Sequence, residues 1–386
     1  MSDAGSTSAT AADARLEERA KREAAHAQRA RFGRRQVIQL VITVAVLALI
    51  FVGLLPKVAD YSEVWPTITD MTWLEIATLV LAGLWNLASY LPVLTAVMPG
   101  LTLRQAFVST EATTAVANTV PAGGAVAVGL TYAMYNSWGF TGAEIVRAVI
   151  VSGVWNSFGK LGMPIIALAL LVVQGDATGG LITAALIGVA VLVAAVVVFA
   201  LLLHSEALAR TIGRGLQRVV AGVYRVFRRP FDRDWGTAAV EFRENTVGLL
   251  ERRWWWLTLA TIVSHLSLFV VLLLCLRHVG VGVDQVSTVK VFAAFSFVRL
   301  LSALPITPGG VGLVELGYVA VLGVGQPDPL KAQILAATLL FRAITYLLPI
   351  PLGVATWLFW RRNTSWRMRP ADRAAGAAQG VAATSV

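Results

Sequence analysis

The chain has 386 residues, of which 57% are hydrophobic and only 14% are charged. Soluble globular domains average about 45–50% apolar and about 25% charged residues, so this composition excludes an ordinary soluble enzyme. The formal net charge of +10 does not indicate nucleic-acid binding, because more than half of the 32 basic residues lie in 1–36 and 205–253, beside apolar segments. Basic clusters in such places are typical of topology signals and of contact with anionic lipid.

Apolar segments long enough to span a bilayer follow one another along the chain, and they predict an all-α polytopic membrane protein. About eight are ordinary candidate transmembrane helices: 36–55, 73–98, 104–120, 143–174, 181–204, 254–278, 289–305 and 330–360. Two further segments, 121–140 and 306–323, are rich in Gly and Pro and are short or broken. Irregular backbone is tolerated at membrane depth only where protein or water satisfies its amides. We therefore expect these two segments to cross as broken helices or to re-enter the membrane.

The two Gly/Pro segments occupy corresponding places in the chain and predict two structural repeats, 36–174 and 181–360. Paired broken segments of this kind indicate a transporter-type site between the repeats. If each segment crosses, the second repeat is inverted and the basic segments 1–36, 205–253 and 361–386 share the cytoplasmic side. If each segment dips in and returns, 205–253 faces outside, against the positive-inside bias. The inverted arrangement is therefore preferred.

The transmembrane domain is predicted to cover 36–362, between disordered or loosely helical tails at 1–35 and 363–386. Within the basic segment 205–253, two kinds of side chain recur at helical spacing on different faces. The apolar face holds Leu208, Ile212, Leu216, Val219 and Val223, and the basic face holds Arg210, Arg214 and Arg218. This pattern favours a helix lying in the membrane interface, with Trp254 to Trp256 at the headgroup level. A soluble cytoplasmic hairpin is the alternative.

Ionisable groups inside membrane spans are costly unless they are paired or hydrated, so each one indicates a candidate functional residue. The candidates are Glu111, Lys160, His265, Arg299, Glu315 and Arg342. Three of them head polar stripes at helical spacing: Glu111 with Thr114 and Asn118, Lys160 with Asn156 and Ser152, and Arg342 with Thr338 and Tyr346. The alternative is structural ion pairing, of Glu111 with Lys160 or of Glu315 with Arg342. His265 is expected to be a satisfied core histidine, whereas Arg299 fits either role.

The two Gly/Pro motifs complete the predicted lipid-binding or substrate-binding set. The first contributes Pro121, Gly123 and Gly124, and the second contributes Thr307, Pro308, Gly309, Gly310 and Gly312. Glycine permits positive φ and close backbone approach, and a helix that starts after such a run offers N–H groups to an anion. A tight helix contact through small residues is the bland alternative for Gly317 and Gly323.

The sequence predicts no enzyme, no cofactor and no metal site. Gly153 to Lys160 has the wrong glycine spacing for a phosphate-binding loop, and Leu161 stands where such a loop has Ser or Thr. Ser157-Phe-Gly-Lys160 lacks the companion motifs of penicillin-recognising enzymes. The single cysteine, Cys275, excludes an intramolecular disulfide.

A family resemblance is carried by three stretches of the second half. They are Leu304-Pro-Ile-Thr-Pro-Gly-Gly-Val-Gly-Leu-Val-Glu315-Leu-Gly, Leu340-Phe-Arg342 and Leu-Pro-Ile-Pro-Leu-Gly353. Over about 36–362 the chain resembles the lysylphosphatidylglycerol synthase transmembrane-region family, which are flippase-like bacterial and archaeal membrane proteins. In the first half Asn118-Thr-Val-Pro-Ala-Gly-Gly matches the family pattern more weakly. Val154 to Lys160 departs from it, because the family often carries a Glu-Arg pair and an Asp there. The resemblance implies the lipid-translocating portion without the soluble synthase domain.

We therefore expect the protein to translocate an anionic phospholipid or polyprenyl-linked lipid across the bacterial cytoplasmic (inner) membrane, with both termini in the cytoplasm. Lys160 and Arg342 are expected to engage the phosphate, and Glu111 and Glu315 to pair or exchange with them. The alternative is a non-catalytic scaffold or accessory subunit for a lipid-modifying or cell-envelope glycosyltransferase, with an envelope-biosynthesis enzyme or a second copy of the chain as partner. An intramembrane enzyme would need a nucleophile–base pair that the sequence lacks.

Overall fold

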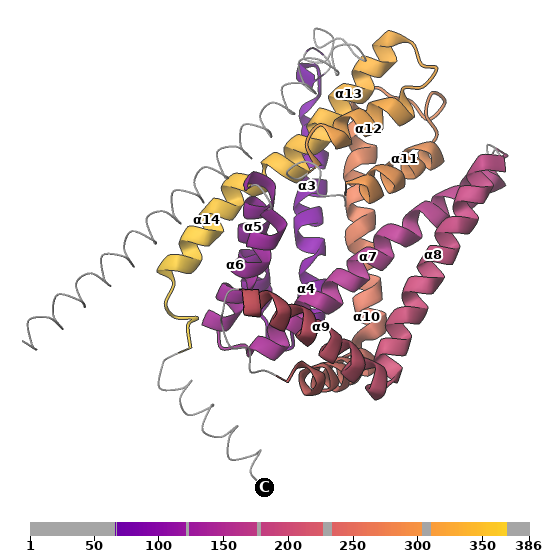
Figure 1. Ribbon diagram of the computed structural model, residues 1–386. Coiled ribbons are helices and arrows are strands. Elements are labelled where there is room, and N and C mark those ends of the chain that lie inside the picture. The colour runs from indigo at the N-terminus through magenta and orange to yellow at the C-terminus, as the bar shows by residue number, and fades with distance from the viewer. Residues whose placement is uncertain are drawn as a thin grey trace, which may run out of the picture. The chain divides into compact units, whose positions relative to one another are not determined.

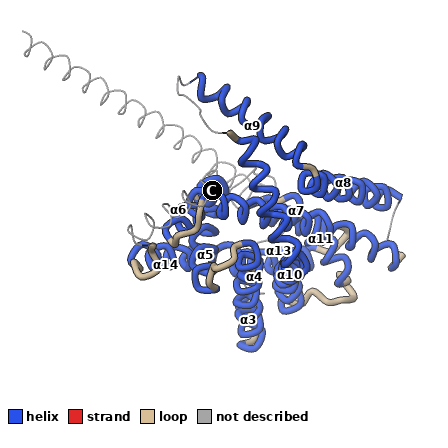
Figure 2. Tube along the Cα trace, turned by 90° about the horizontal axis from the view of Figure 1, so that it is seen from below, coloured by secondary structure: helices blue, strands red, loops and turns tan. Residues whose placement is uncertain are grey.

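The computed structural model describes residues 66, 68–120, 123–175, 179–226, 234–302 and 310–368, all of which belong to one compact unit, Leu55–Val386. These residues form helices and connecting turns, without a strand among them (Figures 1 and 2). The elements are α3 Trp73–Ser89, α4 Leu91–Val97, α5 Leu103–Thr119, α6 Gly123–Ser137, α7 Gly142–Val173, α8 Gly179–His204, α9 Glu206–Val226, α10 Trp235–His278, α11 Thr288–Leu301, α12 Leu313–Leu322, α13 Asp328–Arg342, the π-helical turn η4 Ala343–Leu347 and α14 Pro349–Arg362. The predicted all-α class is confirmed.

Three helices of the first half begin at the same local signal, a threonine followed three residues later by Glu or Gln. Thr72, Thr102 and Thr141 each cap the helix that follows. The side chain of Glu75, Gln105 or Glu144 in turn accepts a hydrogen bond from the backbone N–H of that threonine. Such capping boxes satisfy two N–H groups that would otherwise lack partners at a helix start. Because α3, α5 and α7 start where the sequence dictates, the boundaries of these predicted spans are confirmed to within a few residues.

Five described stretches are long and apolar enough to cross a membrane, which confirms a polytopic membrane protein. They are Trp73–Val97, Gly142–Val173, Leu186–His204, Trp235–His278 and Asp328–Arg362. No part of the apolar window of α8 is buried inside the described protein, so this helix is suited to face lipid. Helices α5 and α11 have only 17 and 14 residues, fewer than the roughly 20 that a span needs. The predicted span 36–55 lies outside the described residues.

Several predicted segments differ from the structure for identifiable reasons. The segment 121–140 contains a continuous helix, α6, because its Gly and Pro residues cluster at one end. The segment 330–360 is a single helical stretch as predicted, but it is irregular, because Pro349 and Pro351 cannot donate N–H bonds to the preceding turn and the chain adopts the π-helical turn η4 between α13 and α14. Helix α10 starts 19 residues before Trp254, because Asp234 caps it at Gly236 and Thr237.

Helices from the two halves pack against each other in three main pairs, α5 with α14, α3 with α10, and α7 with α11 (Figure 1). In the α3–α10 pair, Asn86 Nδ2 donates to Ser267 Oγ at 2.9 Å, an interhelical bond of the kind that joins membrane helices. A buried apolar core lies among α4, α5, α6, α7 and α10, and Met134, Tyr135 and Val151 are at its centre. This arrangement brings both Gly/Pro regions to the same interior.

Helices α5 and α14 pack extensively, and their backbones approach closely at Gly353. A Cβ at this position would meet the Glu111 carbonyl oxygen and the Ala115 side chain. We expect Gly353→Ala to lower the free energy of unfolding by about 1–3 kcal/mol, because the two backbones would have to separate. Gly124→Ala is the matched control, since no atom lies within 4 Å of a Cβ there. Thermal unfolding in detergent measures both, and equal midpoints would contradict the assignment.

Candidate functional site

The second Gly/Pro motif ends in a buried ion pair. Gly310 and Gly312 adopt positive φ angles of 68° and 82°, as the glycines predict, and α12 begins directly after them. The Gly312 N–H donates to Glu315 Oε2 at 2.6 Å, and Arg342 Nε donates to Glu315 Oε1 at 2.8 Å. Only 3% of the Glu315 side chain and 12% of the Arg342 side chain are exposed. The predicted proximity of these two residues is confirmed.

Arg342 also connects this motif to the first one through Tyr346. The guanidinium carbon of Arg342 lies 4.1 Å from the centroid of the Tyr346 ring. The Tyr346 hydroxyl donates to the Asn118 carbonyl at 2.7 Å, and Asn118 Nδ2 donates to the Tyr346 carbonyl at 3.2 Å. Asn118 lies at the end of α5, just before the first motif. A continuous chain of contacts therefore runs from Gly312 to the end of α5.

The turn that carries Tyr346 is itself unusual. η4 follows Arg342 directly, and its i→i+5 bonding widens the helix just before Pro349. π-helical turns are rare and are often found at functional sites. Tyr346 within this turn contacts both Arg342 and Asn118.

A second cluster contains three basic side chains from three different helices, Lys160 of α7, His265 of α10 and Arg299 of α11. Arg299 lies within electrostatic range of both of the others, and Lys160 lies within range of His265. No carboxylate in the described part of the chain forms an ion pair with any of the three. The Arg299 Nε atom is buried and has no hydrogen-bond partner among the described residues. Like charges gathered in low dielectric are unfavourable unless a counter-charge joins them.

His265 belongs to this cluster and is a core residue, as predicted. Its ring is 4% exposed, and neither ring nitrogen has a hydrogen-bond partner among the described residues. The ring packs against Gly159, where a Cβ would lie 2.5 Å from its Cδ2 atom, and close by is Thr261, whose hydroxyl is already used by the Leu257 carbonyl. The Asn156 backbone, on the same helix as Gly159, is a polar group within reach of the imidazole.

Tyr318 joins the two clusters. It is 2% exposed and lies within electrostatic range of Arg299, Arg342 and Glu315. Tyr90, at the junction of α3 and α4, lies near Arg299 and Ser152 on the opposite side. Sequence reasoning missed both tyrosines, although Tyr318 lies one turn after Glu315 on the same face of its helix. That spacing was the available signal.

Glu111 does not pair with Lys160, so that alternative is wrong. Glu111 is 1% exposed, and its Oε2 atom has no hydrogen-bond partner in the described chain. Helix α5 packs against α14, and the Glu111 carbonyl faces Gly353, whereas Lys160 belongs to the α7 surface near α10 and α11. The two charges therefore belong to different helix interfaces.

The family comparison covers both clusters. Residues 36–353 match the family described as lysylphosphatidylglycerol synthase TM region. The chain belongs to this family. A search of curated proteins finds no match. The stretch Val154 to Lys160 lies in α7, and its last residue belongs to the cluster of three basic side chains.

Other residues predicted for the site of this family member have separate outcomes. Gly123 allows a close approach, because a Cβ would lie 2.6 Å from the Val116 and Ala117 carbonyl oxygens, whereas Gly124 adjoins open space. Asn156 lies on α7 one turn before Lys160. Pro121, Thr307, Pro308 and Gly309 lie outside the described residues.

The geometry of helix α7 and the distribution of possible metal ligands limit the chemistry of the site. Gly153 to Lys160 lies inside this continuous helix, so it forms no phosphate-binding loop. Pro164, four residues after Lys160, has no N–H to donate, which leaves the Lys160 carbonyl without its usual helical partner. Among the described residues no group of three or more His, Cys, Asp or Glu side chains could hold a metal ion.

Proposed function

We propose that this family member translocates an anionic lipid, a phospholipid or a polyprenyl-linked intermediate, between the leaflets of the bacterial cytoplasmic membrane. The observation that carries the proposal is the cluster of Lys160, His265 and Arg299, which lies within membrane helices without a carboxylate partner in the described chain. A phosphate headgroup supplies the missing negative charge. Guanidinium and ammonium groups bind phosphate through charge-assisted hydrogen bonds.

The ion pair of Glu315 and Arg342 gives the proposal a second, exchangeable site. Arg342 Nε donates to Glu315 Oε1, and the guanidinium lies over the ring of Tyr346. A phosphate can replace the carboxylate at the guanidinium with similar bidentate geometry. Tyr318 lies between this pair and Arg299, so a headgroup that leaves one cluster is close to the other.

The packing of the helices supports a repeat with a site between its copies. In the proposed repeat, the corresponding helices are α3 and α4 with α10, α5 with α11, α6 with α12, and α7 with α13 and α14. If each helix is exchanged for its counterpart, the α5–α14 contact becomes the α11–α7 contact, which is also present. The same exchange turns α5–α6 into α11–α12 and leaves α3–α10 as a contact between the two first helices. Contacts that survive such an exchange are expected of the internal repeats of transporters. An inverted second copy, and a cytoplasmic side shared by 1–36, 205–253 and 361–386, are part of the proposal.

Reconstitution tests the proposal directly. Vesicles with the purified protein would contain acyl-labelled fluorescent phosphatidylglycerol, and dithionite added outside would destroy label in the outer leaflet. We expect the labelled phosphatidylglycerol of the inner leaflet, which is otherwise protected, to become accessible to dithionite in protein-containing vesicles. Labelled phosphatidylcholine in the inner leaflet should stay protected because it carries no net negative charge. A fluorescent polyprenyl phosphate would be compared in the same way.

Two outcomes would overturn the proposal. Equal movement of the anionic and neutral lipids would mean that the basic clusters do not select the headgroup. Protection of every anionic lipid tested would favour a scaffold role, in which the same residues only stabilise the helix bundle. Lipid that co-purifies with the protein, identified by native mass spectrometry, would independently show which headgroup is bound.

A further inference from the structure

Helix α9 lies outside the two clusters and sorts its side chains onto three distinct faces. It begins at Glu206, one residue after α8 ends at His204. The face toward α10 is made of small residues: Ala209 is buried, and Gly213 leaves no room for a Cβ against the Trp235 carbonyl. Gln217 Oε1 accepts from the Trp235 N–H at 3.2 Å. Helix α9 and the start of α10 therefore pack together as a helical hairpin.

The apolar stripe of α9 is nevertheless left outside the hairpin. Leu208, Ile212, Leu216 and Val219 are 37%, 40%, 52% and 67% exposed. The side chain of Val223, predicted to continue the stripe, lies outside the described part. Four large apolar side chains in one line need a nonpolar cover, which the described chain does not supply.

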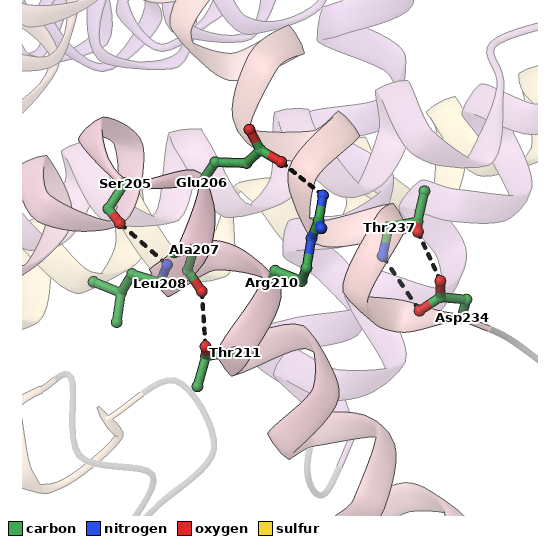
Figure 3. Close-up of polar contacts among 8 residues, drawn as sticks. All are labelled: Ser205, Glu206, Ala207, Leu208, Arg210, Thr211, Asp234 and Thr237. Carbon is green, nitrogen blue, oxygen red and sulfur yellow. Dashed lines mark hydrogen bonds and ion pairs between the residues drawn. The ribbon is translucent and has the colours of Figure 1, made fainter.

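The three arginines on one side of α9 differ in whether an acidic side chain already pairs with them. Arg210 is bound to Glu206 at 2.6 Å (Figure 3). Arg214 and Arg218 form no ion pair among the described residues, and they line an open cavity of about 600 Å³ that Asp234 also borders. Asp234 is used for capping, because it accepts bonds from the Gly236 N–H and from the backbone and side chain of Thr237, of which the Thr237 bonds are drawn in Figure 3. These bonds, first that from the Thr237 side chain, lower the pKa of Asp234.

The neighbouring helices place this surface at a membrane. No part of the apolar window of α8 is buried inside the described protein, although one side of α8 packs on α7, and α9 continues from its end through Ser205 alone. Trp254, Trp255 and Trp256 of α10 are exposed, as in the aromatic belts at membrane interfaces. A lipid surface therefore lies within reach of α9, whereas a protein partner would have to be brought to it.

We propose that α9 lies in the membrane interface and binds anionic phospholipid, with Leu208, Ile212, Leu216 and Val219 in the acyl-chain boundary and Arg214 and Arg218 at the phosphate level. An interfacial helix buries its apolar face about 5–10 Å deep, and a helix is about 10–12 Å wide, so the opposite face reaches the headgroups. Arg210 contributes less because Glu206 already neutralises it. This inference does not depend on lipid translocation by the clusters.

Depth measurements on the full chain test the orientation. In a Cys275→Ser background, an environment-sensitive NBD label would be attached at Leu216→Cys on the apolar stripe or at Ala207→Cys on the arginine side. In vesicles with 30% phosphatidylglycerol we expect doxyl-labelled lipid to quench the label at 216 and aqueous iodide to quench the label at 207. Quenching of both labels by iodide would overturn the proposal. Shielding of position 216 from both quenchers would also overturn it, since a protein surface would then cover the stripe.

Charge removal tests the lipid class. Attraction to an anionic surface is worth about 1 kcal/mol per arginine, which corresponds to about five-fold. The label at position 216 reports the ratio of membrane-bound to free α9. We therefore expect Arg214→Gln/Arg218→Gln to lower this ratio about 25-fold in the anionic vesicles and to leave it unchanged in phosphatidylcholine vesicles. Arg252→Gln/Arg362→Gln removes two exposed arginines elsewhere and should leave that ratio unchanged. An equal fall for both double variants, or no fall for either, would overturn the assignment of Arg214 and Arg218.

Discussion

Replacing Arg342 with Gln is expected to abolish translocation of anionic lipid and to lower stability together. The substitution leaves the Glu315 carboxylate buried, with the Gly312 N–H as its one remaining partner among the described residues. Removing one member of a buried ion pair costs about 3–5 kcal/mol, because the remaining charge is uncompensated. Thermal unfolding in detergent and the dithionite assay in vesicles measure the two effects on the same protein. Arg342→Lys should retain part of the activity, since a lysine keeps the charge and loses the bidentate geometry.

The double variant Glu315→Gln/Arg342→Gln separates the two roles. A glutamine at position 315 still accepts the Gly312 N–H and can bond a second glutamine, so no buried charge remains. We expect the unfolding midpoint to return close to that of the unmodified protein while translocation stays lost. A stable double variant with full activity would remove this pair from the proposed site. It would favour the scaffold alternative, in which the pair only holds α12 to α13.

Replacing Lys160 with Met is expected to move stability and activity in opposite directions. Lys160 lies near Arg299 and His265 without a carboxylate partner in the described chain, so its charge opposes folding when no ligand is bound. A lysine at the centre of a span costs roughly 2.5–3.5 kcal/mol on insertion scales, which bounds the gain from removing it. The unfolding midpoint should therefore rise, while translocation of phosphatidylglycerol should fall at least ten-fold. Functional sites commonly carry this kind of local instability.

Arg104→Met is the control for loss of one positive charge. Arg104 is exposed in the first turn of α5, so its removal should change neither quantity measurably. A Lys160→Met protein that loses stability would show that the ammonium group has a structural partner. A Lys160→Met protein that is more stable and fully active would exclude Lys160 from the lipid path, and the proposal would then rest on Arg299 and Arg342.

The sequence by itself determined that the protein lies in a lipid bilayer, and it determined where most of the described helices begin. Uninterrupted apolar segments have no stable place in water, and Thr72, Thr102 and Thr141 fix three helix starts through bonds to residues only three positions away. Positive φ at Gly310 and Gly312 was predictable for the same reason, since it is a local property of glycine. Arg342 and Glu315 could be paired in advance because one short connection joins their helices.

Only the tertiary structure decided which charges from distant parts of the chain meet. Glu111 and Lys160 are both single charges in apolar helices, and nothing local indicates that α5 turns toward α14 while α7 turns toward α10 and α11. His265 looked like an ordinary core residue until Gly159, a hundred residues earlier, was placed against its ring. Helix packing depends on the shape of whole surfaces, which small residues such as Gly159 and Gly353 set jointly with their partners. The sequence pattern of one helix shows its period and its apolar face. Which other helix packs against that face is decided by the packing of all the helices together.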